Sequence, residues 1–128
     1  MRPLRALILR EAGPPESAVW PGDDDPRAGH YAVLGEDGAA LAVGSVVVEG
    51  GGWRVRGMAT APEARGRGLG AVVLAALLEH ALEHGGGLVW CNARPRAESL
   101  YARAGFVAVG EPWVDPLTGP HRRMELQP

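Results

Sequence analysis

Short apolar runs, separated by turn residues, fill the first half of the chain outside residues 11–29. Runs of this length with partial alternation predict strands, because alternate side chains of a strand point to the same side. Four strands are expected, over Leu4–Arg10, His30–Leu34, Ala40–Val48 and Trp53–Ala59. The short links Glu36-Asp37-Gly38 and Gly50-Gly51-Gly52 predict that neighbouring strands run antiparallel.

The pattern changes to a helical period after residue 67. Apolar side chains recur every three or four residues, which predicts a helix over Gly68–His84 that ends at Gly85-Gly86-Gly87. The apolar run Leu88–Cys91 predicts a buried strand. Because a helix separates it from the strand Trp53–Ala59, the two strands are expected to be parallel and joined by a right-handed crossover.

The last third of the chain predicts a second helix and a final hairpin. The helix is expected over Pro95–Ala104, since proline suits the first helical position and Gly105 suits the left-handed residue after the last turn. Strands are expected over Val107–Val109 and His121–Leu126, with a loop at Asp115–Gly119. The order predicts a mixed α+β fold with a mostly antiparallel central sheet and flanking helices.

Length and composition favour one domain over residues 1–128. Hydrophobic residues make up 46% of the chain, and no apolar run approaches the roughly 20 residues of a membrane span. No secretory leader is recognised, so we expect a cytoplasmic location and no membrane partner. A net charge of −2 gives no basic field for nucleic acid. The lone Cys91 excludes an internal disulfide, and no His/Cys cluster has metal-ligand spacing, so no metal is expected.

The segment Arg65–Gly70 contains three glycines and two arginines at the start of the predicted helix. Free backbone N–H groups and the helix dipole make such a loop a phosphate site. The spacing Gly66-x-Gly68-x-x-Ala71 also fits a dinucleotide fingerprint, although the glycines stand away from the strand and no ribose-binding acid follows. A P-loop is excluded because no Gly-Lys-Ser/Thr follows. A nucleotide-binding domain of another fold, or a turn that binds nothing, is the alternative.

Two motifs narrow these possibilities. The stretch Gly57–Gly70 resembles the acetyl-CoA-binding motif of the GCN5-related N-acetyltransferases (GNAT family), whose pattern Arg/Gln-x-x-Gly-x-Gly/Ala is met by Arg65, Gly68 and Gly70. The stretch Ala97–Phe106 resembles that family's second signature, Ala-x-x-Leu-Tyr-x-x-x-Gly-Phe. The resemblance implies a GNAT-like acyl-CoA N-acyltransferase fold with a splayed pair of parallel strands. It implies direct acetyl transfer from acetyl-CoA to a primary amine of a small molecule or peptide.

The resemblance also assigns the cofactor-binding residues. Backbone groups of Met58 and Thr60 would pair with the pantetheine amides, and backbone N–H groups of the glycine loop would hold the pyrophosphate. The side chains of Arg65 and Arg67 would add charge-assisted hydrogen bonds to phosphate oxygens. The expected cofactor-binding set is Met58, Thr60, Arg65, Gly66, Arg67, Gly68, Leu69 and Gly70.

Tyr101 matches the family's general acid, which protonates the leaving thiolate. From the residues alone, packing of its ring in the core explains Tyr101 equally well. An oxyanion would be stabilised by a backbone N–H near Met58 or Ala59. The amine must also lose a proton. Candidate bases and substrate contacts on or near predicted strands are His30, Glu49 and His121.

The sequence departs from the family pattern in three places. Arg94 stands where Asn often precedes the second signature, and Thr60 stands where Val is usual. The region between the first two strands, which shapes the acceptor site in the family, is short and rich in proline. The acceptor is therefore not identified, and a non-catalytic acyl-CoA-binding or sensing module of the same fold is the alternative. Exposed sheet edges make a homodimer a candidate assembly.

Overall fold

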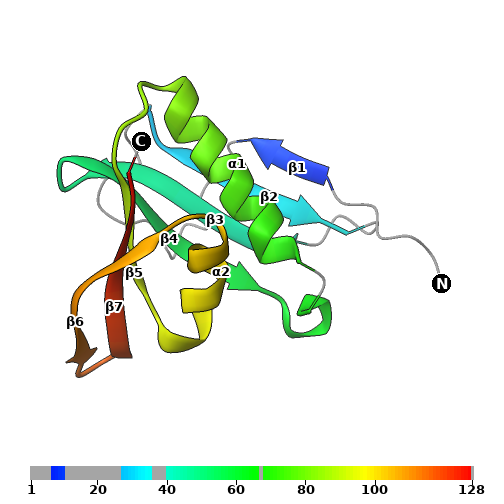
Figure 1. The fold of residues 1–128 in the computed structure, drawn as a ribbon. Helices are drawn as coiled ribbons and strands as arrows, with labels where there is room; N and C mark the ends of the chain where they lie inside the picture. The colour runs from blue at the N-terminus through cyan, green and yellow to red at the C-terminus, as the bar shows by residue number, and fades with distance from the viewer. Residues whose placement is uncertain (1–6, 11–26, 36–39, 67, 128) are drawn as a thin grey trace.

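A seven-stranded sheet forms the centre of the protein, in a computed structural model that describes residues 7–10, 27–35, 40–66 and 68–127 (Figure 1). The strand order across the sheet is β1-β2-β3-β4-β5-β7-β6. The strands are β1 (Leu7–Arg10), β2 (Gly29–Leu34), β3 (Ala40–Glu49), β4 (Gly52–Thr60), β5 (Val89–Ala93), β6 (Val107–Asp115) and β7 (Gly119–Leu126). All neighbouring pairs are antiparallel except β4–β5, which is parallel as predicted.

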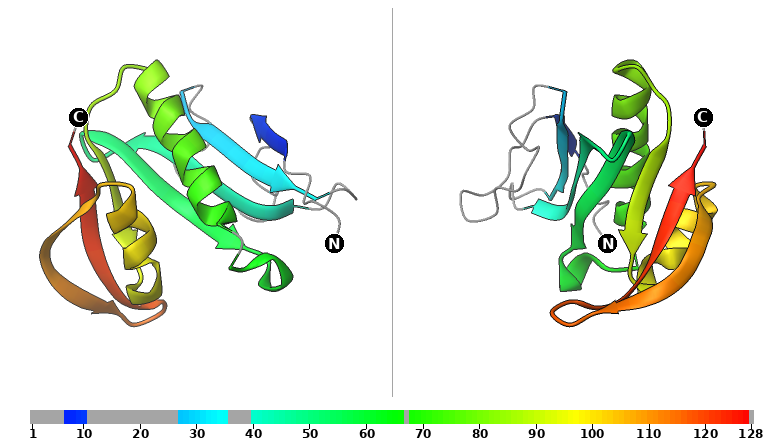
Figure 2. Two further views of the ribbon diagram at one scale, coloured as in Figure 1. Left: turned by 45° about the vertical axis from the view of Figure 1, so that its right-hand side comes forward. Right: turned by 90° about the vertical axis from the view of Figure 1, so that its left-hand side faces the viewer.

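Two helices cover one face of this sheet. Helix α1 spans Leu69–Glu83 and α2 spans Glu98–Arg103, and single 3-10 turns, η2 (Pro62–Ala64) and η3 (Pro95–Ala97), precede them. Figures 1 and 2 show α1 and α2 on the same side of the sheet, which we call the helix face. The start of α1 lies near α2, because a Cβ built on Gly70 would lie 3.6 Å from Leu100 Cδ2. The other side, on which none of the described helices lies, is called the opposite face.

The parallel strands β4 and β5 separate soon after they meet. Only Trp53 with Val89 and Arg54 with Trp90 are paired across them. Both strands continue beyond the second pair, and this unpaired length, residues 55–60 of β4 and 91–93 of β5, is called the divergence. The sequence correctly predicted the parallel pair, and the resemblance to the family correctly implied that it is splayed.

A β-bulge marks the course of β4 through the divergence. Val43 pairs with Ala59 and Ser45 pairs with Arg56, so two β4 residues, Gly57 and Met58, lie opposite Gly44 alone. Gly57 has φ +69, the left-handed conformation that suits glycine in such bulges. The extra residue bends the strand and increases its twist at the point where it leaves β5.

Gly44 connects this bulge to α1. A Cβ at Gly44 would collide with Sδ of Met58 and would lie 2.9 Å from Cγ1 of Val73 on α1. Glycine therefore allows the helix to approach the bulged strand closely. Around this contact the core is tightly packed, with Val73, Leu74 and Leu77 at 0%, 1% and 0% exposure.

His80 joins the far end of α1 to β2. Its Nε2–H donates to the carbonyl of Arg27 at 2.8 Å, and its Nδ1 accepts from the Tyr31 hydroxyl at 3.0 Å. The imidazole ring is 1% exposed and lies so close to β2 that a Cβ on Gly29 would lie 2.8 Å from it. Because both ring nitrogens are engaged, this buried histidine serves packing and orientation.

The sequence prediction was wrong about the length of β6. A strand over Val107–Val109 was expected, whereas β6 runs to Asp115 and forms a long hairpin with β7. Gly110 (φ +77) and Pro112 read as strand breakers, but the register shifts between Val109 and Trp113, so both residues lie at a bulge that a sheet edge tolerates. In the part of the chain described, neither helix has the length and hydrophobicity needed to cross a membrane.

Two further expectations fall on residues outside the described ones. They are the first three residues of the strand predicted from Leu4 and the turn Glu36-Asp37-Gly38. At the other predicted elements the structure moves boundaries by one to three residues, which leaves their type and order as expected.

Candidate active site

The glycine loop lies between the end of β4 and the start of α1. Gly66 and Gly68 have φ values of +80 and +75, and Gly68 is the N-cap of α1. The helical ladder begins with Val72 N–H donating to the Gly68 carbonyl at 3.2 Å, so the N–H groups of the first turn point out of the helix. Left-handed residues beside a helix start turn successive N–H groups into a concave anion site. No atom lies within 4 Å of a Cβ built on Gly66 or Gly68, so the loop is open.

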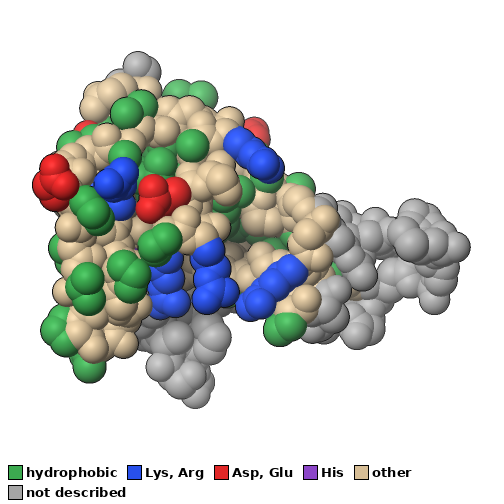
Figure 3. All heavy atoms as spheres, turned by 60° about the horizontal axis from the view of Figure 1, so that its bottom comes forward, with side chains coloured by type: hydrophobic (Ala, Val, Ile, Leu, Met, Phe, Trp, Pro, Cys, Tyr) green, Lys and Arg blue, Asp and Glu red, His purple; other side chains and the backbone are tan. Residues whose placement is uncertain are grey.

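Basic side chains gather at the end of the molecule toward which β4 and β5 run (Figure 3). Arg65 follows β4, and Arg94 and Arg96 follow β5; all three are exposed. The carboxyl ends of parallel strands meet at one edge of a sheet, so these residues share this end. Arg67, another expected phosphate contact, lies outside the described residues.

The backbone of β4 faces the divergence at the two positions that the resemblance identified. The Ala61 N–H donates to the Leu41 carbonyl at 2.8 Å, toward β3. Since backbone N–H groups alternate in direction along an extended chain, those of Thr60 and Met58 point away from β3, toward the side from which β5 has departed. Two hydrogen-bonding residues therefore line the divergence just before the glycine loop.

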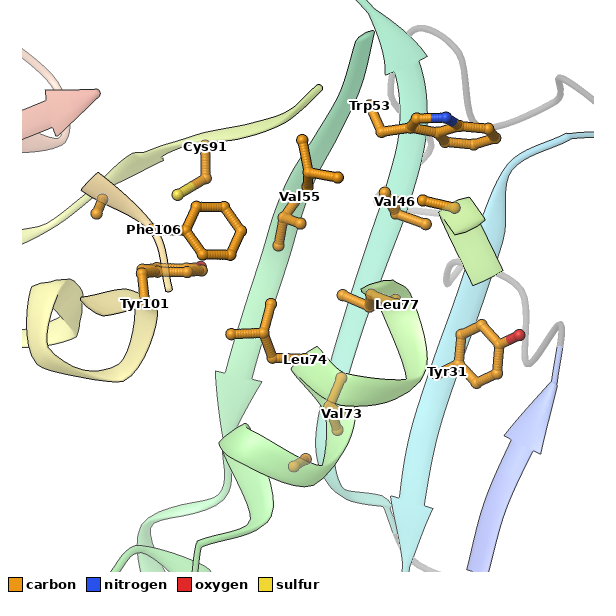
Figure 4. Packing of buried hydrophobic residues seen from close by; sticks show 14 of the residues in the cluster. Tyr31, Val46, Trp53, Val55, Val73, Leu74, Leu77, Cys91, Tyr101 and Phe106 are labelled. Carbon is orange, nitrogen blue, oxygen red and sulfur yellow. The ribbon is translucent and has the colours of Figure 1, made fainter. Parts of the chain in front are cut away.

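Tyr101 lies on the helix face, in contact with the core. It is 5% exposed, and its ring packs edge-on against Phe106 with centroids 5.3 Å apart. Figure 4 shows the Tyr101 ring pointing from α2 toward β4, below Phe106 and Cys91. Burial, and to a smaller extent the nearby Cys91 thiol, raises the pKa of Tyr101 above its ordinary value, so the hydroxyl keeps its proton at neutral pH. Core packing and proton donation are therefore both compatible with its position.

Cys91 is a buried residue of β5, at 1% exposure. Desolvation by burial raises the pKa of its thiol to about 12. The thiol is the protonated, weakly nucleophilic form at neutral pH. This agrees with the expectation that Cys91 is a core residue.

The three candidate bases do not come together. His30 on β2 is 8% exposed, and its Nδ1 lies 2.7 Å from Ser45 Oγ. His121 on β7 places Nδ1 2.9 Å from the Gly119 carbonyl oxygen and stacks on Trp113, with centroids 5.8 Å apart. Glu49 ends β3 beside Gly52, far along the strand from the glycine loop. No base is identified by proximity to Tyr101.

A cluster on the opposite face was missed by sequence reasoning. Glu49 accepts from Arg54 Nη1 at 2.8 Å and from Arg56 Nη1 at 3.4 Å. The Arg54 and Arg123 guanidinium carbons lie 5.1 and 4.2 Å from the ring centroid of Trp90. Arg123 Nε donates to Glu125 Oε2 at 2.7 Å. This set is called the arginine cluster: Arg54, Arg56, Arg123, Trp90, Glu49 and Glu125.

A signal for part of the cluster exists in the sequence. Arg54 and Arg56 alternate with Trp53 and Val55, so the strand carries arginines on one face and core side chains on the other. Arg123 gives no such signal, because only the pairing of β5 with β7 brings it to Trp90.

A family model described as the acetyltransferase (GNAT) family matches residues 4–106. The chain belongs to the GNAT family. It is 30% identical over 125 residues to the uncharacterized N-acetyltransferase YitI of Bacillus subtilis (strain 168), a match that covers 92% of this chain and 83% of YitI.

Solved structures share this fold. A nourseothricin acetyltransferase is 26% identical, with a TM-score of 0.69 over 86% of this chain and 69% of that protein. Escherichia coli ElaA is 15% identical, with a TM-score of 0.78 over 97% of this chain and 99% of ElaA, a likeness of fold alone. The protein is thus a GNAT N-acetyltransferase, and GNAT enzymes use acetyl-CoA and act on amines. Among the described residues, no group of three His, Cys, Asp or Glu side chains is placed to hold a metal ion.

Proposed function

We propose that this protein transfers the acetyl group of acetyl-CoA directly to a primary amine of a small molecule or peptide. One observation carries the proposal: β4 and β5 separate after two pairs, ahead of an open glycine loop, and alternation along β4 directs the backbone groups of Thr60 and Met58 into the divergence. A pantetheine chain needs hydrogen-bonding partners along its amides, and its pyrophosphate needs an anion site at one end. The divergence offers the two in this order along β4.

The phosphate end of acetyl-CoA would bind at the start of α1. The N–H groups of Gly66, Gly68, Leu69 and Gly70 would donate to the pyrophosphate, and the helix dipole favours negative charge there. The exposed Arg65 side chain is near enough in sequence to add charge-assisted hydrogen bonds. Arg67 belongs to the same proposal on the strength of the motif.

The chemical step places different groups on the two faces of the sheet. The amine nitrogen attacks the thioester carbon, and a backbone N–H of the bulged part of β4, near Met58 or Ala59, stabilises the oxyanion. The C–S bond then breaks as the C–N bond persists, and Tyr101 gives its hydroxyl proton to the thiolate. The amine loses one proton, and Tyr101 regains one from solvent.

Of the candidate bases, we retain His30 first. It lies on the opposite face in the row His30–Ser45–Arg56, which reaches β4 at the divergence. Glu49 reaches the closed end of the divergence, but both of its carboxylate oxygens accept from arginines there, and His121 is held within the β6–β7 hairpin. Neither position supports a proton transfer at the divergence as well as His30 does.

The test is release of coenzyme A in the presence of acetyl-CoA and a panel of amines. The panel includes nourseothricin and spermidine, which two proteins of similar fold are named for. We expect amine-dependent release of coenzyme A together with the acetylated amine by mass spectrometry. Binding of acetyl-CoA without turnover of any amine would instead support the acyl-CoA-sensing alternative. Thermal stabilisation by NAD or ATP, and none by acetyl-CoA, would contradict the donor.

We also propose a homodimer that uses the β6 edge of the sheet, in a cytoplasmic protein. Strand β6 has one neighbour, and large apolar side chains stand exposed on it, with Val107 at 66% and Val114 at 73% exposure. Exposed apolar surface of this kind is typical of interaction sites. A mass corresponding to two chains in light scattering is expected, and a Val114→Glu variant that stays dimeric would contradict the use of this edge.

A further inference from the structure

We propose that the acceptor amine carries a carboxylate and that the arginine cluster binds it. This inference rests on the proposed function, because it concerns the acceptor of the same acetyl transfer. It narrows the acceptor from any primary amine to an amino-acid-like molecule. No motif of the sequence indicates this class.

The acceptor is expected to approach from the opposite face. The glycine loop begins helix α1, so the phosphates of acetyl-CoA would lie on the helix face, and Tyr101 also reaches the divergence from there. A nucleophile needs an unobstructed path to the thioester carbon. Both described helices lie on the helix face, so we expect the amine to come from the opposite face, where the arginine cluster stands.

Strand register places the cluster at the divergence. Arg54 and Trp90 form the last pair between β4 and β5, and they lie on the opposite face because Trp53 and Val89 face the core. Two residues farther along, Arg56 lies on β4, and Asn92 lies on β5 beside its partner Arg123 on β7. Arginines therefore stand on both sides of the divergence, with the Arg54–Trp90 pair at its closed end.

The contacts hold these side chains in place for an anion. The guanidinium of Arg54 lies over the Trp90 ring, with its central carbon 5.1 Å from the ring centroid, and this cation–π contact restrains the side chain. Glu49 takes the Nη1 donor of Arg54, whereas Arg54 Nε is buried and has no hydrogen-bond partner among the described residues. A buried donor of this kind is costly unless an acceptor meets it. Arg54 and Arg123 keep 28% and 34% side-chain exposure, so a ligand can reach them.

The arginines that a ligand can reach favour a negative charge on the ligand. Arg54 and Arg123 each place a partly exposed positive charge beside Trp90. A carboxylate neutralises that charge and matches the planar fork of a guanidinium. A polyamine brings only positive charge to the same place, so the cluster disfavours it.

The experiment compares amines that differ only by a carboxylate. The pairs are lysine with cadaverine and phenylalanine with phenethylamine, with phosphoethanolamine added as a phosphate-bearing amine. We expect kcat/KM about 10- to 100-fold higher for the carboxylate member of at least one pair, the range of a charge-assisted hydrogen bond. The preference should come mainly from KM, because the carboxylate binds before and during the reaction.

Variants of the arginine cluster then test whether its arginines cause the preference for a carboxylate. Arg54→Gln and Arg123→Gln should each reduce the ratio of kcat/KM within a pair by about 10-fold, with little change in acetyl-CoA affinity. The matched control is Arg103→Gln, since Arg103 is exposed in the last turn of α2 on the helix face. Unchanged acetyl-CoA affinity in each variant shows that it is folded, and using two cluster variants guards against misfolding of one.

Several results would overturn the inference while the proposed function stands. They are equal or faster turnover of the decarboxylated amines, a preference for phosphoethanolamine, and a carboxylate preference that both arginine variants retain. If acetyl-CoA binds but none of these amines is acetylated, the carboxylate inference is overturned, and the proposed function is judged by the wider panel. If acetyl-CoA itself does not bind, both fail.

Discussion

The two faces of the sheet at the β4–β5 divergence are built from the same strands and differ in almost every physical property. On the helix face, Val55, Cys91 and Tyr101 are buried in an apolar core. On the opposite face, alternate residues of the same strands carry charges in ion pairs and over an indole ring. Because side chains alternate along a strand, a single segment such as residues 53–56 contributes to both environments.

This difference suggests that the two faces have different roles in the reaction. The apolar side raises the pKa of Tyr101 and of Cys91, which keeps protons on both groups. On the polar side, glutamates hold the arginine side chains in ion pairs. In the proposed reaction, the helix face handles the donor and the leaving thiolate, whereas the opposite face selects the acceptor. Substitutions on the helix face should therefore affect all acceptors alike.

The largest effect is expected at Tyr101. A Tyr101→Phe variant keeps the ring and loses the proton, so kcat should fall by about 10²- to 10⁴-fold, the usual contribution of a general acid. Acetyl-CoA affinity should stay within a few-fold, and the loss should be equal for every amine that the wild type accepts. Steady-state kinetics with two acceptors measures both quantities. A kcat of Tyr101→Phe equal to that of the wild type would mean that Tyr101 serves only in packing.

The next largest effect is expected at Gly68, where a substitution tests the role of the glycine loop in binding phosphate. Gly68→Leu places a side chain where phosphate would bind and forces a left-handed conformation, which costs about 1–2 kcal/mol. We expect acetyl-CoA affinity to fall by at least about 10-fold, a loss of roughly 1.4 kcal/mol or more in binding. Calorimetric titration measures it.

Gly51→Leu is the matched control for this variant. Gly51 has φ +78 and open space around its Cβ, like Gly68, but it lies in the β3–β4 turn. It should lose similar stability and keep its affinity for acetyl-CoA. Equal affinities of the two variants would argue against the loop as the phosphate site.

A smaller effect is expected where α1 meets the bulge. Gly44→Ala forces Met58 or Val73 to move, and overpacking of this kind costs about 1–3 kcal/mol of the free energy of unfolding. The cost should shrink in a Met58→Ala background, because the smaller side chain makes room. Denaturant unfolding of the two single variants and the double variant gives the coupling. Additive effects would mean that the two residues do not share this contact.

The smallest effect on activity is expected at Cys91. Cys91→Ala should keep kcat within about two-fold at pH 7.5, since the protonated thiol takes no part in the reaction. The contribution of the Cys91 thiol should appear instead in the pH dependence of the free energy of unfolding. The pKa of the thiol is about 12 in the folded protein against an ordinary 9.0. The protonated form therefore supports folding below pH 9, and this support is lost as the pH rises from 9 toward 12.

Unfolding at several alkaline pH values checks the Cys91 prediction. Wild type should lose up to about 1.4 kcal/mol more stability per pH unit than Cys91→Ala in this range. Parallel curves for the two proteins would contradict the buried, protonated thiol. A collapse of kcat in the variant would contradict the assignment of Cys91 to the core.

Local patterns were sufficient to predict most elements of this fold. Helix α1, the parallel β4–β5 pair and the glycine loop are each encoded in contiguous residues, so spacing and turn chemistry identified them. The length of β6 was not predictable, since Gly110 and Pro112 end strands in most contexts and are accommodated here only at a bulge. The bulge at Gly57 and Met58 depends on the register with β3, which no local pattern contains.

The candidate site divides in the same way. The residues expected to bind acetyl-CoA form one continuous motif, and their assignment stays a prediction that Gly68→Leu tests. The arginine cluster unites Arg54, Trp90 and Arg123 from three strands that are distant in sequence. Its members meet only after β5 pairs with β4 and β7. Because this long-range pairing leaves no local pattern in the sequence, the cluster could not be predicted.

The bulge in β6 also affects how this protein behaves at high concentration. An edge strand with exposed valines would ordinarily offer backbone N–H and C=O groups to a further strand, and growth by repeated addition leads to fibrils. Pro112 has no N–H to offer, and the turn of the chain at Gly110 interrupts the straight edge. A second molecule can thus meet the apolar side chains without extending the sheet. In the proposed dimer, we therefore expect this hairpin to form a closed pair of molecules and to oppose open-ended aggregation.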